Sequence, residues 1–330
     1  MDKHTAAPRA SRAGAGLAAI ALAAALWALG AVLAAGLFAD GVAPLELAEA
    51  RSIVSALGLA LLPASWRRPQ SPRRSGRARP VSVRRSGRAR PASPPSAAVR
   101  RRLVTLGVCI GLVNAVYYVA IDRLPVAVAL VLQYTAPALV VVYTAIRLRA
   151  RPRNEVLVAV VLALAGVALV SGLLGAELGS VDLLGVAMGL ASAVLFATYT
   201  LVGESVTRVY GPLGAMFRAF CIAGALWICW QVFNGIPYEL FDPANLPRVV
   251  LIGVGATLAP FLLYLWGVER VKAERAAIAA TLEPVLGAVV AWTFLAQSLG
   301  VVQIVGGALV IAAVILIQTG RSRPVLTPEL

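Results

Sequence analysis

The sequence predicts an all-α polytopic membrane protein with ten transmembrane helices, arranged as two inverted five-helix repeats. Three observations lead to this class. Hydrophobic residues make up 60% of the 330 residues, the charged residues gather in a few segments, and one long apolar stretch recurs later in the chain. A soluble protein needs polar residues along its whole length to cover its surface, and this chain lacks them.

The recurrence joins two segments without a gap at an offset of 147 residues. Residues 122–166 align with residues 269–313, which places Arg123 on Arg270 and Pro137 on Pro284. Internal duplication in so apolar a chain is typical of secondary transporters. The two copies are therefore read as the two halves of one membrane domain.

The number of spans follows from helix length, because a helix needs about 20 mostly apolar residues to cross a bilayer. The second expected span is the least apolar, since Glu46, Glu49 and Arg51 lie in its first turns. The ten expected spans are residues 14–38, 44–65, 103–121, 125–146, 156–173, 183–202, 212–233, 249–267, 274–295 and 300–318.

Basic residues predict the orientation, because Lys and Arg accumulate in cytoplasmic loops. With the N-terminus inside, nearly all of the 30 basic residues fall in cytoplasmic segments, and an even number of spans returns the C-terminus to the cytoplasm. The copies begin at the third and eighth spans, an odd separation, so they enter the membrane in opposite directions. The expected units are a tail at 1–13, repeats at 14–173 and 183–318, and a tail at 319–330.

One cytoplasmic segment stands apart in composition. Residues 67–102 carry thirteen arginines, and the sequence RRSGRARP occurs there twice, at 73–80 and 84–91. Such a segment buries too little apolar surface to fold alone, so we read it as a disordered loop. The alternative is contact with anionic lipid head groups, worth about 1 kcal/mol per basic residue. Nucleic-acid binding is disfavoured, because no aromatic residues alternate with the arginines.

Several kinds of chemistry are absent from the sequence. Its one histidine, His4, lies in the N-terminal tail, which excludes His-based metal sites and Ser-His or Cys-His pairs. No phosphate-binding loop of the type G-x-x-x-x-G-K-[ST] is present, so ATP hydrolysis is not an energy source. We therefore expect no enzyme activity, no cofactor and no metal. Transport would run downhill or be coupled to an ion or proton gradient.

Polar groups within a bilayer are costly, so each is a functional candidate. Glu283 is the strongest, because it lies in mid-span directly before Pro284, which is expected to bend the helix. A carboxyl group there can bind a substrate amine, carry a proton, or serve as a structural group at the bend. In the first copy, Gln133 and Tyr134 precede Pro137, a second expected bend, and present polar groups toward the same region.

Mid-span aromatic and amide side chains complete the expected pathway, with ordinary bundle packing as the alternative for each. The full set of expected substrate or pathway residues is Trp27, Asn114, Tyr117, Tyr118, Gln133, Tyr134, Tyr199, Tyr264 and Glu283. Arg51 and Arg218 are interpreted as arginines that snorkel toward head groups, with anion steering as the alternative.

Two motifs resemble the EamA-type proteins of the drug/metabolite transporter superfamily. They are Leu282-Glu283-Pro284 in the ninth span and Gly306-Gly307-Ala308-Leu309 in the tenth, and the run IDRLPVAVALVLQYTAP resembles the family pattern around the fourth span. The resemblance implies ten helices in two inverted halves around a central cavity, and export of amino acids or other small metabolites. Two departures are Ala296-Gln297, where the family often has Gly-Glu, and the long Arg-rich insertion.

The function predicted from these features is a secondary transporter of small organic metabolites in the bacterial inner membrane, an exporter of amino acids or related compounds. The partners expected are the solute and membrane lipids. A homodimer is compatible with the sequence, which leaves the oligomeric state open. The alternatives are an exchanger of nucleotide sugars or phosphorylated sugars and, in another class, a membrane scaffold without transport activity.

Overall fold

The computed structural model describes residues 7–62, 96–124, 126–171, 173–175, 182–294 and 300–319. All regular secondary structure in these ranges is helical, which confirms the predicted all-α class. The expectations for His4, for most of the Arg-rich segment, for Ala296-Gln297 and for the end of the C-terminal tail concern residues outside these ranges.

The first copy contains α1 (Ala7–Ala39), α2 (Pro44–Ala60), α3 (Ala97–Arg123), α4 (Val126–Gln133), α5 (Ala136–Leu148) and α6 (Asn154–Val170). A short 3-10 turn, η2 (Leu173–Gly175), follows. The second copy contains α7 (Leu183–Asn234), the 3-10 turn η3 (Tyr238–Phe241), α8 (Leu246–Gly253), the π-helical turn η4 (Val254–Leu258), α9 (Ala259–Val271), α10 (Ala273–Ala280), α11 (Leu282–Phe294) and α12 (Val301–Thr319).

The helix boundaries repeat at the offset found in the sequence. Moving α4 by 147 residues reproduces the bounds of α10, and the same shift takes the start of α6 to the start of α12. Both copies therefore break at the same place, after Gln133 and after Ala280, and resume close to a proline. A proline has no N–H for the preceding turn, so it suits the first turn of a new helix better than a helix interior.

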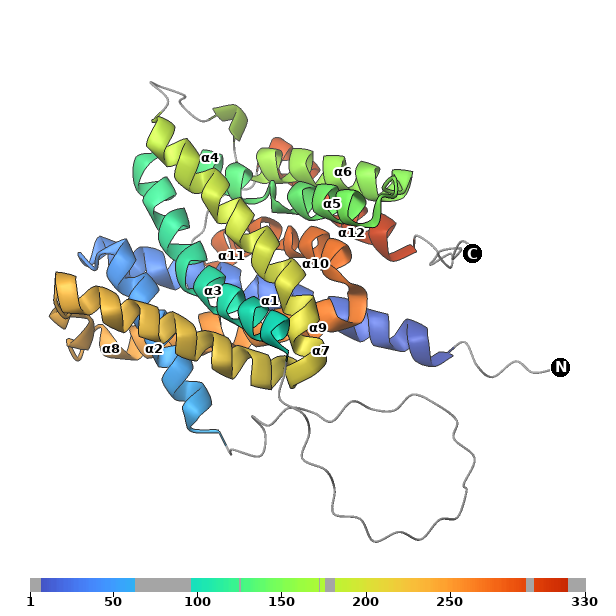
Figure 1. Cartoon of the computed structure of the whole chain (residues 1–330). Helices are drawn as coiled ribbons and strands as arrows, with labels where there is room; N and C mark the ends of the chain where they lie inside the picture. Colours follow the sequence, from blue (N-terminus) through green and yellow to red (C-terminus); the bar gives the residue numbers. More distant parts are fainter. Residues whose placement is uncertain are drawn as a thin grey trace, which may run out of the picture.

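The long helix α7 contains two arms, and Figure 1 shows that it folds back on itself. The break lies at Gly211, whose φ of 70° is unfavourable for residues with a Cβ, and Pro212 follows it. The sequence predicted two spans here, 183–202 and 212–233, and assigned residues 203–211 to neither. Instead, the first arm remains helical up to the glycine.

Five helical segments in the described residues are long and apolar enough to cross a membrane. They are Arg12–Phe38, Ala97–Arg123, Val128–Leu148, Leu183–Asn234 and Leu246–Val271. Asn154–Val170 and Val301–Ile317 are apolar but shorter. A multi-pass membrane protein is thus supported, whereas the count of ten spans and their inverted arrangement remain predictions.

Close contacts between helices depend on small residues. In the described residues, α3 packs most extensively against α7, and a Cβ on Gly107 would lie 2.8 Å from the carbonyl oxygen of Ala219. α6 and α12 also lie side by side (Figure 1), and there Gly166 and Gly306 face each other's backbone. Such close approach without a side chain is the usual basis of packing between membrane helices.

Two helix starts differ from the sequence boundaries. α1 begins at Ala7, inside the expected tail of residues 1–13. α3 begins at Ala97, inside the expected loop of residues 67–102, because the Ser96 side chain accepts a hydrogen bond from the backbone N–H of Val99 and caps the helix.

Candidate functional site

A cavity of about 290 Å³ lies between helices of both copies. Its walls come from α1, α2, α3, α4, α7, α9 and α11, and from the break between α4 and α5. The lining residues are Trp27, Gly30, Ala31, Ala34, Phe38, Arg51, Val113, Asn114, Tyr117, Tyr118, Ile121, Gln133, Tyr134, Phe196, Tyr199, Phe261 and Glu283. A mostly apolar and aromatic wall with a few polar groups is typical of a small-molecule site.

The structure brings together eight of the nine residues singled out in the sequence. The exception is Tyr264, which lies behind the wall. Its side chain is fully buried, its ring centre is 5.5 Å from that of Trp27, and its hydroxyl group is 3.0 Å from the Thr200 hydroxyl. Tyr264 therefore supports the lining and does not form part of it.

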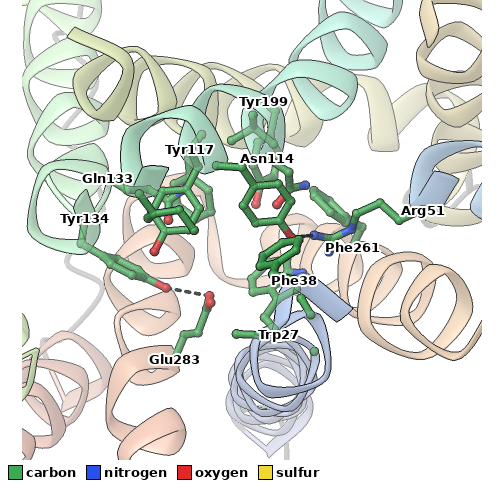
Figure 2. Close-up of a pocket in the computed structure, with 17 residues that line it drawn as sticks. Trp27, Phe38, Arg51, Asn114, Tyr117, Gln133, Tyr134, Tyr199, Phe261 and Glu283 are labelled. Carbon is green, nitrogen blue, oxygen red and sulfur yellow. Dashed lines mark hydrogen bonds between the residues drawn. The ribbon is translucent and has the colours of Figure 1, made fainter. Parts of the chain in front are cut away.

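A hydrogen bond joins the two copies at one end of the cavity. The Tyr134 hydroxyl donates to Oε2 of Glu283 across 2.7 Å (Figure 2). Tyr134 lies in the break after α4, and Glu283 lies in the first turn of α11, directly after the equivalent break. The N-terminal turn of a helix favours a negative charge, so the helix start after this break is a favourable place for a carboxyl group.

Arg51 lies at the opposite side of the cavity in Figure 2. Its Nε donates to the Thr257 hydroxyl across 2.7 Å, Nη1 to the Tyr118 hydroxyl across 2.7 Å, and Nη2 to the Ala256 carbonyl across 3.1 Å. Because the residue is only 6% exposed, the snorkelling interpretation of Arg51 was wrong. Its position beside Glu49 in the least apolar span was the available signal that it has a polar environment.

Arg218, the other arginine in this interpretation, lies outside the lining. Its guanidinium group is 4.7 Å from the ring centre of Tyr210 and donates to the carbonyl group of Gly214 across 2.8 Å. The two arginines, which the sequence analysis interpreted in the same way, therefore have different surroundings.

Phe38, Phe196 and Phe261 are lining residues that the sequence analysis did not select. A phenylalanine in an apolar span carries no polar signal that distinguishes a cavity wall from ordinary packing. Phe38 contacts Tyr118 edge to face, with ring centres 5.5 Å apart, and Phe196 contacts Tyr199 in the same way at 5.0 Å. These contacts hold the tyrosines in place around the cavity.

Some polar groups in the lining lack a partner. The Tyr199 hydroxyl is buried and forms no hydrogen bond in the part of the chain that the structure describes. The side-chain amides of Asn114 and Gln133 line the same space (Figure 2). Buried polar groups normally find partners, so an unpartnered hydroxyl at a cavity indicates a place for a ligand or water. Among the described residues, no group of three or more His, Cys, Asp and Glu side chains is placed to hold a metal ion.

This fold and site define a class of protein, namely a helical membrane protein with a cavity of solute size between two related halves. The sequence model of the EamA-like transporter family matches residues 14–172 and again residues 183–319. The chain belongs to this family, which confirms the resemblance found in its sequence.

Curated relatives are named as transporters. The threonine/homoserine exporter of Salmonella typhimurium is 27% identical over 226 residues, covering 65% of this chain and 70% of the relative. The threonine/homoserine exporter of Escherichia coli is 28% identical over 220 residues, with coverage of 65% and 70%. An uncharacterized transporter of Archaeoglobus fulgidus is 28% identical over 217 residues, with coverage of 66% and 76%.

A protein of known crystal structure has a similar fold. It superimposes with a TM-score of 0.66 at 18% sequence identity, covering 94% of this chain and 98% of the other. At this level of identity the likeness concerns the fold alone.

Proposed function

We propose that the protein is a secondary transporter of small organic metabolites, and that it exports amino acids or related compounds by alternating access. The observation that carries this proposal is the cavity, whose polar wall is built by both copies and joined by the bond between Tyr134 and Glu283. Membership of a transporter family and the names of the amino-acid exporters among the relatives point the same way. Midplane sites between repeats are typical of such transporters.

The shape of the cavity supports one state of an alternating-access cycle. Its lining on α1 comes from residues 27–38 and on α3 from residues 113–121, the C-terminal parts of both helices. The N-terminal parts are closed by packing, since Gly16 and Gly267 approach each other and a Cβ on Gly267 would lie 2.7 Å from the Gly16 carbonyl oxygen. With the N-terminus in the cytoplasm, this state is closed on the inside.

The proposed arrangement has ten spans in two inverted repeats, at 14–173 and 183–318, with both termini in the cytoplasm. The repeated breaks after Gln133 and Ala280 support two equivalent halves, and the turn at Gly211 supplies the change of direction within α7. Single cysteines placed at residues 43 and 150, in a variant without native cysteines, test this topology. An impermeant thiol reagent added to intact cells should label residue 43 and leave residue 150 unlabelled, and the opposite pattern would reject the arrangement.

Transport itself is tested with purified protein in liposomes loaded with radiolabelled L-threonine. We expect efflux from the wild type, and its loss in Glu283→Gln, which keeps the shape of the side chain but removes its charge. Glu269→Gln is the matched control, because Glu269 lies outside the cavity at the end of α9 and forms an ion pair with the adjacent Arg270. Unchanged efflux in a folded Glu283→Gln protein would remove this residue from the mechanism.

The alternative functions differ in the groups that they need. An exchanger of nucleotide sugars or phosphorylated sugars must neutralise a phosphate, whereas the described lining places one arginine opposite one carboxyl group. A membrane scaffold needs no solute, so a protein that neither moves nor binds any solute of a broad metabolite panel would favour this class.

A further inference from the structure

We propose that the cavity binds a zwitterion, with Glu283 contacting its ammonium group and Arg51 contacting its carboxylate group. The ligand class is that of neutral α-amino acids and compounds with the same two charges. The claim that this ligand is the substrate rests on the transport function proposed above. The claim that the ligand binds rests on the cavity alone.

The two charged groups share the cavity without pairing with each other. Arg51 donates to Tyr118, Thr257 and Ala256, and Glu283 accepts from Tyr134. Neither takes part in an ion pair among the described residues. Opposite charges that are held apart in an apolar space are each poorly compensated. A ligand that carries a positive and a negative charge and lies between Glu283 and Arg51 compensates both side chains at once.

The acidic end has room for an ammonium group. Oε2 of Glu283 accepts from Tyr134, while Oε1 accepts no hydrogen bond from the described residues, and Figure 2 shows the side chain pointing into the cavity. An ammonium group has three donors. The amide oxygens of Asn114 and Gln133 in the same wall can accept further donors.

The basic end is oriented in advance for a carboxylate. A guanidinium group has five N–H donors, and Arg51 directs one from each of its three nitrogens to protein acceptors. One N–H on each terminal nitrogen therefore remains, and a carboxylate has two oxygens that can accept them. Because partners on α3 and η4 hold the group in place, little freedom is lost when a ligand binds.

Ligands with a single charge fit this arrangement less well. An organic cation would be attracted by Glu283 and the aromatic wall, but Arg51 would repel it and keep its two N–H groups unused. An organic anion would be attracted by Arg51 but repelled by Glu283. Hydrogen bonds to charged groups contribute enough for us to expect at least about a tenfold loss of affinity when either ligand charge is removed.

The remaining wall determines what kind of side chain the amino acid can carry. Phe196, Tyr199 and Phe261 offer aromatic surface for an apolar side chain. The unpartnered Tyr199 hydroxyl adds one hydrogen-bonding group for a small polar substituent. Apolar side chains and short hydroxyl-bearing side chains therefore both fit the wall.

Three sets of probes that differ in which charged group they carry test the proposal. Each set contains an amino acid, the amine that lacks its carboxylate and the acid that lacks its amine. The sets are L-leucine with 3-methylbutylamine and 4-methylpentanoate, L-phenylalanine with 2-phenylethylamine and 3-phenylpropanoate, and L-threonine with 1-aminopropan-2-ol and 3-hydroxybutanoate. Affinity is measured on the purified full-length protein by ligand-induced thermal shift.

We expect at least one amino acid to bind about tenfold more tightly than both of its analogues. Glu283→Gln should remove the preference over the acid analogue, and Arg51→Gln should remove the preference over the amine analogue. The matched controls are Arg208→Gln, at the exposed end of an ion pair with Glu204, and Glu269→Gln, and both should retain both preferences.

Wild-type protein that binds an amine or an acid as tightly as the amino acid, in every set, would overturn the proposal. This criterion needs no variant, so it holds even if Arg51→Gln fails to fold after losing three buried bonds. Retention of both preferences in a folded Glu283→Gln protein would also overturn it. Selective binding of an amino acid without flux in liposomes would instead contradict the proposed transport and leave the zwitterion site standing.

Discussion

Tyr134 and Glu283 lie two aligned positions apart at the equivalent breaks of the two copies, and a hydrogen bond of 2.7 Å joins them. Because Tyr134 is 3% exposed and Glu283 faces the cavity, the tyrosine orients the carboxyl group from behind. Each copy thus contributes one partner of this bond. A movement of one half against the other would change the bond directly.

Tyr134→Phe should weaken transport while leaving the fold intact. The change removes the hydroxyl that holds Oε2 of Glu283, and a hydrogen bond to a charged group is worth about 1.5–3 kcal/mol. We expect the transport efficiency in liposomes to fall about tenfold or more. Tyr143→Phe, on the exposed face of α5, is the control and should transport at the wild-type rate. Equal rates for the two variants would contradict a positioning role for Tyr134.

Tyr199→Phe should separate binding from stability. Since the Tyr199 hydroxyl is buried without a partner in the described residues, its removal costs no hydrogen bond and should not lower the free energy of unfolding. Solute affinity should fall by up to about tenfold where the solute uses this hydroxyl. Thermal unfolding with and without solute measures both effects. Tyr264→Phe, which loses its contact with Thr200, should show the reverse pattern of lower stability and little change in affinity.

Thr257→Val should destabilise the protein. The Thr257 hydroxyl accepts from Nε of Arg51 and donates to the carbonyl group of Ile252 across 2.9 Å, so valine leaves a buried N–H without an acceptor. Loss of such a partner costs about 1–3 kcal/mol. Thermal unfolding in detergent measures the loss. Thr293→Val, at an exposed position in α11, should be close to neutral. A Thr257→Val protein as stable as the wild type would show that Arg51 does not depend on this acceptor.

Gly166→Ala should disrupt the contact between α6 and α12. The new Cβ would lie 2.7 Å from the carbonyl oxygen of Gly306 and 2.9 Å from the backbone nitrogen of Val310. Since both atoms are backbone, the helices would have to separate, at a cost of about 1–3 kcal/mol. Gly14→Ala provides the control, because a Cβ there meets nothing within 4 Å. Equal melting temperatures for the two variants would contradict this packing.

Asp182→Asn should reduce the dependence of stability on pH. The backbone N–H of Gly185 and then the guanidinium group of Arg123 lower the pKa of Asp182 below its usual value of 3.8. The stabilisation is therefore present above about pH 3.8 and is lost as the pH falls through the lowered pKa. Asparagine still caps α7 but cannot ionise.

Melting temperatures from pH 6 down to pH 3 measure this difference. The wild type should lose stability at the acid end more steeply than Asp182→Asn. Asp122→Asn, at an exposed position at the end of α3, should follow the wild-type profile. Parallel profiles for all three proteins would show that the ion pair with Arg123 does not contribute.

The sequence by itself determined the helical class, the duplication and eight of the seventeen residues that line the cavity. These follow from local causes, because apolar length predicts a span, proline predicts a break, and a polar residue in an apolar span needs a protected place. Glu283 and Tyr134 could be found in this way, since both precede a proline in aligned copies.

Only the tertiary structure decided which groups meet. The partners of Arg51 lie 67 residues away in α3 and more than 200 residues away in η4, a separation at which no local pattern connects them. It also decided that Tyr264 supports the wall from behind and that three phenylalanines belong to the lining. Local composition determines that a side chain avoids lipid, whereas the packing of distant helices determines what it contacts.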